Sequence, residues 1–236
     1  MMNTPPVLIL AGGLGTRLRK VIKNTPKVLV PVNGRPFVEL LINNLSKQGV
    51  NEIILLTGYL GELVDDYIFK SKIDKKLNLR INTIKEDVPL GTGGAVANAV
   101  NKLSLTRNFI IINGDTWMDN FYKKLFNNSL PTLGLVKVKD ISRYGHVEVN
   151  NLNNKVTSFS EKNDNRLADW VNSGAFYTKP TFFKKLNKKN YSLEKDLLPI
   201  LVNEGLLNAI KLETSFIDIG IPSDYKLFVN QITNKA

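Results

Sequence analysis

The chain has 236 residues, of which 43% are hydrophobic and 22% are charged, a balance typical of a globular protein rather than a disordered one. It has no cysteine, which excludes disulfides, thiolate metal sites and a cysteine nucleophile, and its one histidine, His146, leaves little room for a histidine-built metal site or a Ser/His/Asp triad. The formal net charge is +11. Because the lysines are scattered rather than gathered in one stripe, we expect a small polyanionic ligand and no nucleic-acid partner.

The sequence shows no signal for membrane insertion or secretion. No apolar run approaches the roughly 20 residues that span a bilayer. The N-terminal apolar stretch has no basic region before it and is interrupted early by Gly12 and Gly13, so a secretory signal is not expected. We therefore expect a cytoplasmic protein with no membrane partner.

The first half of the chain alternates between predicted strands and predicted helices. Apolar runs predict strands at 7–10, 53–57, 79–84 and 109–113, and residue spacing and composition predict helices at 37–48, 60–67 and 93–102. Such alternation is typical of a parallel sheet with helices on both faces. The predicted fold class is therefore α/β, with an open and mostly parallel sheet.

The second half of the chain has a different pattern. Strand candidates at 132–138, 146–149, 156–160 and 172–177 are separated by polar turns, and helices are predicted at 180–186, 193–204 and 222–232. This pattern predicts an antiparallel elaboration of the sheet. Since no repeat or low-complexity linker separates the halves, residues 1–236 are expected to form one domain with the halves 1–115 and 116–236.

The segment after the first predicted strand carries the clearest chemical signal. Gly12, Gly13 and Gly15 would let backbone amides approach a phosphate closely, and Arg17 and Lys27 would pair with phosphate oxygens. The pattern is not a P-loop, which ends in Gly-Lys-Ser/Thr, and it lacks the third glycine of the dinucleotide-binding pattern. The alternative is an ordinary glycine-rich turn with a solvated arginine.

Two aspartates stand in apolar surroundings. Asp115 follows the predicted strand at 109–113, and Asp218 lies within the apolar run 216–219. A carboxylate in such a place costs free energy unless it is paired or bound to a metal ion. Each aspartate by itself is more often a helix cap or a turn residue, so a further observation is needed to favour a metal site.

These residues make the chain resemble the sugar-1-phosphate nucleotidylyltransferase family. The resemblance begins with AGGLGTRLRKVIKNTPK at residues 11–27 and continues in family order over nearly the whole chain. Its further motifs are Pro89-Leu90-Gly91-Thr92-Gly93-Gly94-Ala95, Asn113-Gly114-Asp115, Tyr144-Gly145-His146-Val147-Glu148, Glu161-Lys162, Val171-Asn172-Ser173-Gly174 and Phe216-Ile217-Asp218-Ile219-Gly220. The resemblance implies a Rossmann-like sheet of the nucleotide-diphospho-sugar transferase type with an antiparallel sugar-binding elaboration.

The resemblance also implies an enzyme that transfers a nucleoside monophosphate from an NTP to a sugar 1-phosphate and releases pyrophosphate. The implied catalytic residues are Arg17, Lys27, Asp115 and Lys162. Asp115 and Asp218 are expected to hold Mg²⁺, an ion that prefers one or two carboxylates together with phosphate oxygens. The implied nucleotide-binding residues are Ala11, Gly12, Gly13, Gly15, Thr16, Arg17, Glu86, Pro89, Gly91, Thr92 and Gly114.

The implied sugar-phosphate contacts are Gly145, Glu161, Lys162 and Asn172. Their alternative roles are a hairpin glycine and surface charge after a strand. His146 stands where the family usually has an apolar residue and is expected to be structural. On the nucleotide side, a carboxylate at position 86 would accept hydrogen bonds from N1 and N2 of guanine, which favours GTP over a pyrimidine nucleotide.

The subgroup that the chain resembles most is the D-glycero-D-manno-heptose 1-phosphate guanylyltransferases, through Leu18-Arg19 and the segments 31–37 and 192–196. The chain departs from the wider family in lacking a proline after Leu18 and a tryptophan before Asp218. A mannose- or glucose-1-phosphate nucleotidylyltransferase using GTP, UTP, dTTP or CTP therefore stays an alternative, as does a non-catalytic nucleotide-sensing relative. The expected partners are the NTP and the sugar 1-phosphate, with a homodimer as a candidate assembly.

Overall fold

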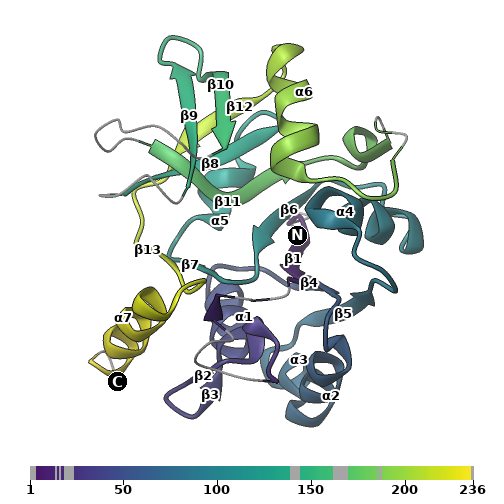
Figure 1. Ribbon diagram of the computed structural model, residues 1–236, viewed down its shortest axis with the longest axis vertical. Helices are drawn as coiled ribbons and strands as arrows, with labels where there is room; N and C mark the ends of the chain where they lie inside the picture. The colour runs from purple at the N-terminus through teal and green to yellow at the C-terminus, as the bar shows by residue number, and fades with distance from the viewer. Residues whose placement is uncertain are drawn as a thin grey trace. The chain divides into compact units, whose positions relative to one another are not determined.

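The computed structural model describes residues 4–13, 15, 17–18, 24–138, 144–161, 170–184, 186 and 188–234, with the side chains of 160 and 161 excepted. The chain forms two compact units that are interleaved along the sequence (Figure 1). The first unit comprises residues 1–88, 112–119 and 215–236, and the second comprises 89–111 and 120–214. Each unit is described below by itself.

The sheet of the first unit is parallel. Its strands β1 (Val7–Ala11), β4 (Glu52–Thr57) and β5 (Arg80–Lys85) lie in the order β5-β4-β1. Val7 pairs with Ile53, and Ile53 pairs with Ile81. Every residue of β4 is buried, as a strand inside a parallel sheet requires. Strand β6 (Phe109–Asn113) belongs to this unit only through its last two residues.

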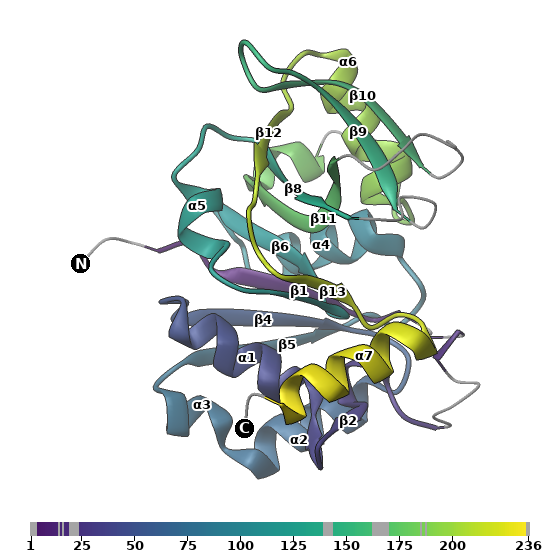
Figure 2. The same cartoon turned by 90° about the vertical axis from the view of Figure 1, so that its left-hand side faces the viewer.

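Helices connect these strands. They are α1 (Phe37–Lys47), α2 (Gly61–Ser71) and α3 (Ile73–Leu77), which Figure 2 shows beside β4 and β5. The short elements η2 (Lys27–Leu29), β2 (Pro31–Val32) and β3 (Arg35–Pro36) lie between β1 and α1. The pair β7 (Thr116–Met118) and β13 (Phe216–Asp218) and the helix α7 (Pro222–Thr233) complete the unit.

An aromatic cluster joins three elements of the first unit. The ring of Phe228 on α7 lies 5.3 Å from that of Phe37 on α1 and 5.1 Å from that of Trp117 on β7, measured between ring centroids. Phe228 is only 1% exposed. This contact attaches α7, which directly follows β13, to the rest of the unit.

Replacing Phe228 by alanine should lower the free energy of unfolding by about 3–5 kcal/mol, because the change removes a buried ring and leaves a cavity between α1, α7 and β7. Denaturant unfolding followed by circular dichroism measures this loss. Leu227→Ala is the control, since Leu227 is 51% exposed on the same helix and its loss should change the stability by less than about 0.5 kcal/mol. Equal losses for the two variants would contradict the role of the cluster.

The second unit contains a mixed sheet whose five strands close on themselves. The strands are β8 (Thr132–Lys137), β9 (Gly145–Asn150), β10 (Lys155–Glu161), β11 (Trp170–Thr178) and β12 (Asn208–Lys211). Their order is β11-β8-β12-β10-β9, and β9 also pairs with β11. Strands β12 and β8 run parallel, whereas the pairs β10–β12, β10–β9, β11–β8 and β11–β9 are antiparallel.

The helical elements of the second unit are α4 (Gly91–Lys102), α5 (Tyr122–Phe126), η3 (Pro180–Lys184), η4 (Leu193–Leu197) and α6 (Leu198–Asn203). The first residues of β6 also belong to this unit. None of the helices in the described part of the chain combines the length and the apolar character that crossing a bilayer requires.

The predicted fold class and the order of its long elements are confirmed, with ends that shift by a few residues. Two predicted helices differ in type from an α-helix. The segment predicted at 180–186 forms a 3-10 helix at Pro180–Lys184, and the segment predicted at 193–204 begins as a π-helix and continues as α6. Short elements such as β7, β12 and β13 were not predicted. A strand of three or four residues shows no periodicity by which it could be recognised.

Candidate active site

The glycine segment after β1 lies beside Glu86. A Cβ atom added to Gly12 would lie 3.0 Å from Oε1 of Glu86, and one added to Gly58 would lie 2.6 Å from the same oxygen. Glu86 directly follows β5, and its N–H donates to the carbonyl of Thr57 at 2.9 Å. Since β1, β4 and β5 are parallel, their carboxyl ends share one edge of the sheet, which is where open α/β sheets bind ligands. The structure thus brings two predicted nucleotide-binding residues together.

The rest of the glycine segment provides open backbone. Gly15 has a φ of +59°, and a Cβ there would lie 3.3 Å from Cβ of Lys27, whereas a Cβ at Gly13 would meet no atom within 4 Å. Ala11 ends β1 and is buried. Arg17 is exposed. Thr16 lies outside the described residues.

Gly114 places Asp115 next to this segment. Its N–H donates to the carbonyl of Leu10 at 3.0 Å, and a Cβ at this position would lie 2.6 Å from that oxygen. Only glycine therefore permits this approach to β1. Asp115, the next residue, is held close to the carboxyl end of β1.

Lys27 and Asp115 form an ion pair. Their side chains are 13% and 24% exposed, respectively. Lys27 is placed by Pro26 at the start of η2, with its Cβ against Gly15. Because water screens the pair only in part, its electrostatic field is stronger than that of a surface pair. The predicted catalytic cation and the predicted metal-binding carboxylate are thus in direct contact.

Asp218 joins them through the pairing of β7 with β13. Asp218 is opposite Thr116 in this pair, and the N–H of Ile219 donates to the carbonyl of Asp115 at 2.9 Å. A Cβ at Gly220 would lie 2.7 Å from Oδ1 of Asp218 and 2.8 Å from Nζ of Lys27. Asp218 and the Lys27–Asp115 pair therefore lie close together, although 103 positions separate the two aspartates in the chain (218 minus 115).

This group can accommodate a cation. Within the described residues, three or more Asp, Glu or His side chains nowhere gather into a metal-binding cluster. An ion held by Asp115 and Asp218 would therefore need further ligands from substrate phosphates or water, which is the usual arrangement for Mg²⁺. Asp115 already has a positive partner, the ammonium group of Lys27. The donor set fits a hard divalent ion.

In the second unit, the predicted nucleotide-binding residues Pro89, Gly91 and Thr92 lie in the segment 89–94, which we call the base loop after that prediction. Its residues 91–94 are the first residues of α4. A Cβ at Gly91 would lie 2.5 Å from the carbonyl oxygen of Tyr191, and one at Gly93 would lie 2.2 Å from the Tyr191 ring. These glycines are therefore required for packing against Tyr191, whatever else they contact.

Because Tyr191 is buried in this contact, we expect the folded chain to lose stability at high pH. Burial, and secondarily the charge of Asp196, raise the pKa of Tyr191 from 10.0 to about 12. A raised folded-state pKa means that the folded chain holds the phenol proton more tightly than the unfolded chain. This stabilisation should be complete below pH 10.0 and lost as the pH rises to about 12. Between about pH 8 and about pH 12 the melting temperature should fall more steeply in the wild type than in Tyr191→Phe. Parallel plots of melting temperature against pH for the two proteins would contradict this role of Tyr191.

Three of the four predicted sugar-phosphate residues, Gly145, Glu161 and Asn172, lie on the paired strands β9, β10 and β11. Gly145 pairs with Glu161, and the adjacent His146 pairs with Val171, next to Asn172. The Asn172 side chain accepts from the N–H of Gly174 at 2.9 Å. The structure describes the backbone of Glu161 but not its side chain, and Lys162 lies outside the described residues.

A cavity of about 390 Å³ lies along β9 in the same unit. Its lining residues are His146, Val147, Glu148, Val149, Asn151, Trp170 and Lys211. Nζ of Lys211 lies 5.5 Å from the centroid of the Trp170 ring and donates to Asn151 at 3.2 Å. Nδ1 of His146 is buried without a hydrogen-bond partner in the described structure.

Sequence reasoning did not find this cavity. His146 was expected to be structural, and Trp170 and Lys211 carried no motif. Only the pairing of strands from separate parts of the chain brings these side chains together. The available signal was His146, a polar residue at a position where the family usually has an apolar one.

The chain is similar to known proteins over nearly its whole length. Residues 6–235 match the family model described as nucleotidyl transferase. The D-glycero-alpha-D-manno-heptose 1-phosphate guanylyltransferase of Campylobacter jejuni is 37% identical to this chain, and the match covers 94% of this chain and 97% of that protein. The enzyme of the same name from Aneurinibacillus thermoaerophilus is 34% identical, and the match covers 93% of this chain and 94% of that protein. The crystal structure of HddC from Yersinia pseudotuberculosis complexed with GMP-PN is 36% identical with a TM-score of 0.84, covering 97% of this chain and all of that one. The chain therefore belongs to the nucleotidyl transferase family.

Proposed function

We propose that the chain is a guanylyltransferase that converts GTP and D-glycero-α-D-manno-heptose 1-phosphate into GDP-heptose and pyrophosphate. A phosphate oxygen of the sugar 1-phosphate forms a bond to the α-phosphorus of GTP, and the bond from that phosphorus to the departing pyrophosphate breaks. The convergence of Lys27, Asp115 and Asp218 beside the glycine segment carries this proposal. The relatives described above support the choice of substrates.

The reaction requires two anions to meet, so charge neutralisation is the main task of the protein. The attacking group is already an anion and needs no general base. In this proposal Lys27 stabilises the negative charge that develops at the α-phosphate, and Arg17 and Lys162 supply further positive charge. A preorganised cation in a poorly screened site is more effective than the same charge in water. Holding both phosphates in line supplies the rest of the acceleration.

Asp115 and Asp218 are the residues that would hold Mg²⁺. When bound, the ion would neutralise charge on the α-phosphate and the incoming sugar phosphate. The β7–β13 pair and the close contact of Gly114 with β1 support this role, because they hold the two carboxylates near each other. Lys27, which contacts Asp115 in the structure, would then be available to substrate oxygens.

Glu86 supports guanine as the base. Its carboxylate lies against Gly12 at the carboxyl edge of the parallel strands. A carboxylate accepts hydrogen bonds, and the guanine edge offers two donors, N1 and N2, whereas pyrimidine carbonyls are themselves acceptors. Ala11, Gly12, Gly13, Gly15, Thr16, Arg17 and Gly114 would surround the phosphates, and Pro89, Gly91 and Thr92 would flank the base.

The second unit is proposed to bind the sugar phosphate. Gly145 would allow a close approach to the sugar ring, Glu161 and Asn172 would accept or donate hydrogen bonds to its hydroxyls, and Lys162 would pair with its phosphate. The lining of the cavity along β9 includes His146, the neighbour of Gly145, and combines polar side chains with the Trp170 ring and two valines, which suits a polyhydroxylated ligand. A cytoplasmic location and a homodimer stay predictions.

A pyrophosphate-release assay tests the proposal. The chain is incubated with GTP, Mg²⁺ and D-glycero-α-D-manno-heptose 1-phosphate, and then with mannose 1-phosphate or with UTP, dTTP or CTP in place of one substrate. We expect the highest kcat/KM with GTP and the heptose phosphate. A preference for another pair would correct the substrate assignment, and absence of pyrophosphate with every pair would refute the enzyme assignment.

A further inference from the structure

The base loop is held by a second segment of the same unit, residues 188–196. The N–H of Tyr191 donates to the carbonyl of Leu90 at 3.0 Å, and the carbonyl of Tyr191 accepts from Gly93 and Gly94 at 3.0 and 3.1 Å. The side-chain amide of Asn190 donates to the carbonyl of Pro89 at 2.9 Å. These contacts satisfy two of the N–H groups that the start of α4 would otherwise leave free.

The side chain of Thr92 is also engaged by this segment. Its hydroxyl accepts from the N–H of Leu193 at 2.8 Å and donates to Oε2 of Glu194 at 2.8 Å. A hydroxyl has one proton to donate. Because that proton is directed to Glu194, Thr92 does not have it for a nucleotide, and any contact of this residue with the base uses its backbone or its remaining lone pair.

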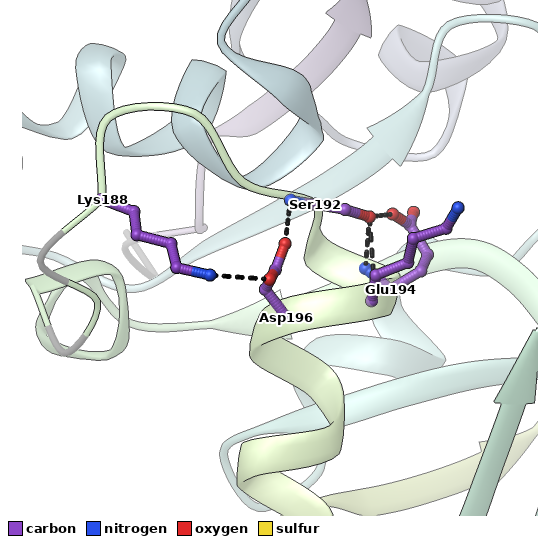
Figure 3. A network of polar contacts seen from close by, with 5 residues as sticks. Lys188, Ser192, Glu194 and Asp196 are labelled. Carbon is purple, nitrogen blue, oxygen red and sulfur yellow. Dashed lines mark hydrogen bonds and ion pairs between the residues drawn. The ribbon is translucent and has the colours of Figure 1, made fainter.

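Glu194 is itself fixed by Ser192 (Figure 3). The hydroxyl of Ser192 donates to Oε2 of Glu194 at 2.8 Å and accepts from the N–H groups of Glu194 and Lys195 at 3.1 and 3.2 Å. The N–H of Ser192 donates to Asp196 at 2.8 Å. Ser192 therefore caps η4, and the same cap orients the carboxylate that receives the Thr92 proton.

We propose that Glu194 is a positioning residue for the nucleotide: through Thr92 it holds the base loop in the conformation that receives the base. The role rests on the nucleotide-binding part of the proposed function, and not on the transfer step. A carboxylate that accepts two hydroxyl protons makes charge-assisted hydrogen bonds, which are stronger than neutral ones. The main-chain contacts with Tyr191 bring the two segments together, and Glu194 fixes the orientation of Thr92 within them.

The test compares the wild type with Glu194→Ala, Glu194→Gln and Thr92→Val. In Glu194→Ala the KM and the dissociation constant for GTP should rise about tenfold, while kcat and the KM for the sugar phosphate change less than about twofold. Glu194→Gln should restore most of the affinity, because its carbonyl can still accept both protons. Thr92→Val should match Glu194→Ala, and the double variant should be no worse than either, as expected for one shared interaction.

Asp196→Ala is the matched control. It removes the acceptor of the Ser192 N–H and the partner of Lys188, but it leaves the contact between Thr92 and Glu194 in place. It should lower the melting temperature without changing the KM for GTP. An unchanged GTP affinity in Glu194→Ala, or an equal rise in Asp196→Ala, would overturn the role of Glu194. A wild type that binds GTP but releases no pyrophosphate would refute the proposed function, and the dissociation constants would still decide the role of Glu194.

Discussion

Replacing Lys27 by methionine should lower kcat about 10³-fold with both substrates saturating. Lys27 is the poorly exposed cation that pairs with Asp115 and lies next to Gly15. Removing one preorganised charge or donor from a site where negative charge develops costs about 10²–10³ in kcat, and this change also leaves Asp115 without its partner. Methionine keeps most of the length of the side chain, so the packing against Gly15 is largely retained. The initial rate of pyrophosphate release measures the effect.

Lys47→Met is the control for this variant. Lys47 is exposed in the last turn of α1, and its replacement changes the net charge of the chain by the same amount. Its kcat should stay within about twofold of the wild type. Circular dichroism and a melting curve establish that Lys27→Met is folded. If the folded variant keeps more than about a tenth of the wild-type kcat, Lys27 is not the main cation of the reaction.

Asp218→Asn and Asp115→Asn should each weaken divalent-ion binding at least about tenfold and lower kcat about 10²-fold. An amide keeps the shape of the carboxylate but loses the charge that the ion requires. The direct measurement is Mn²⁺ titration by electron paramagnetic resonance in the presence of GTP, because it reports binding whether or not turnover occurs. Removing the metal with a chelator should abolish the activity of the wild type, and added Mg²⁺ should restore it.

Asp119→Asn is the matched control for the two metal variants. Asp119 belongs to the same unit and accepts hydrogen bonds from Nε1 of Trp117 and from the hydroxyl of Ser215. An asparagine at this position retains an acceptor, so Mn²⁺ affinity should not change. Equal losses in all three variants would indicate a general disturbance of the β7–β13 region and would contradict a metal site at Asp115 and Asp218.

The sequence by itself was sufficient for the reaction class, and it predicted a phosphate site within one short segment. Gly12, Gly15 and Lys27 lie within one short segment, and local chemistry relates such neighbours: glycines that admit phosphate and a cation that pairs with it. The long elements were predicted for a similar reason. Strands such as β4 and helices such as α1 are long enough to show an apolar run or helical spacing.

Only the tertiary structure decided which distant residues lie close together. Asp115 and Asp218 lie close together because β7 pairs with β13. Each of these strands has three residues and is too short to show periodicity in the sequence. Glu86 reaches Gly12 because β1, β4 and β5 run parallel and end at one edge. A pairing between segments far apart in the chain is set by packing and hydrogen bonds over the whole unit, which local propensity does not encode.

The base loop shows the same division most clearly. Its motif predicted a nucleotide contact, and local sequence explained its glycines as a turn that starts a helix. The structure adds that Gly91 and Gly93 are needed for contact with Tyr191 and that the hydroxyl proton of Thr92 goes to Glu194. Neither fact could be read from the chain, because a residue's hydrogen-bonding capacity is a local property, whereas the partner that uses it is determined by the fold.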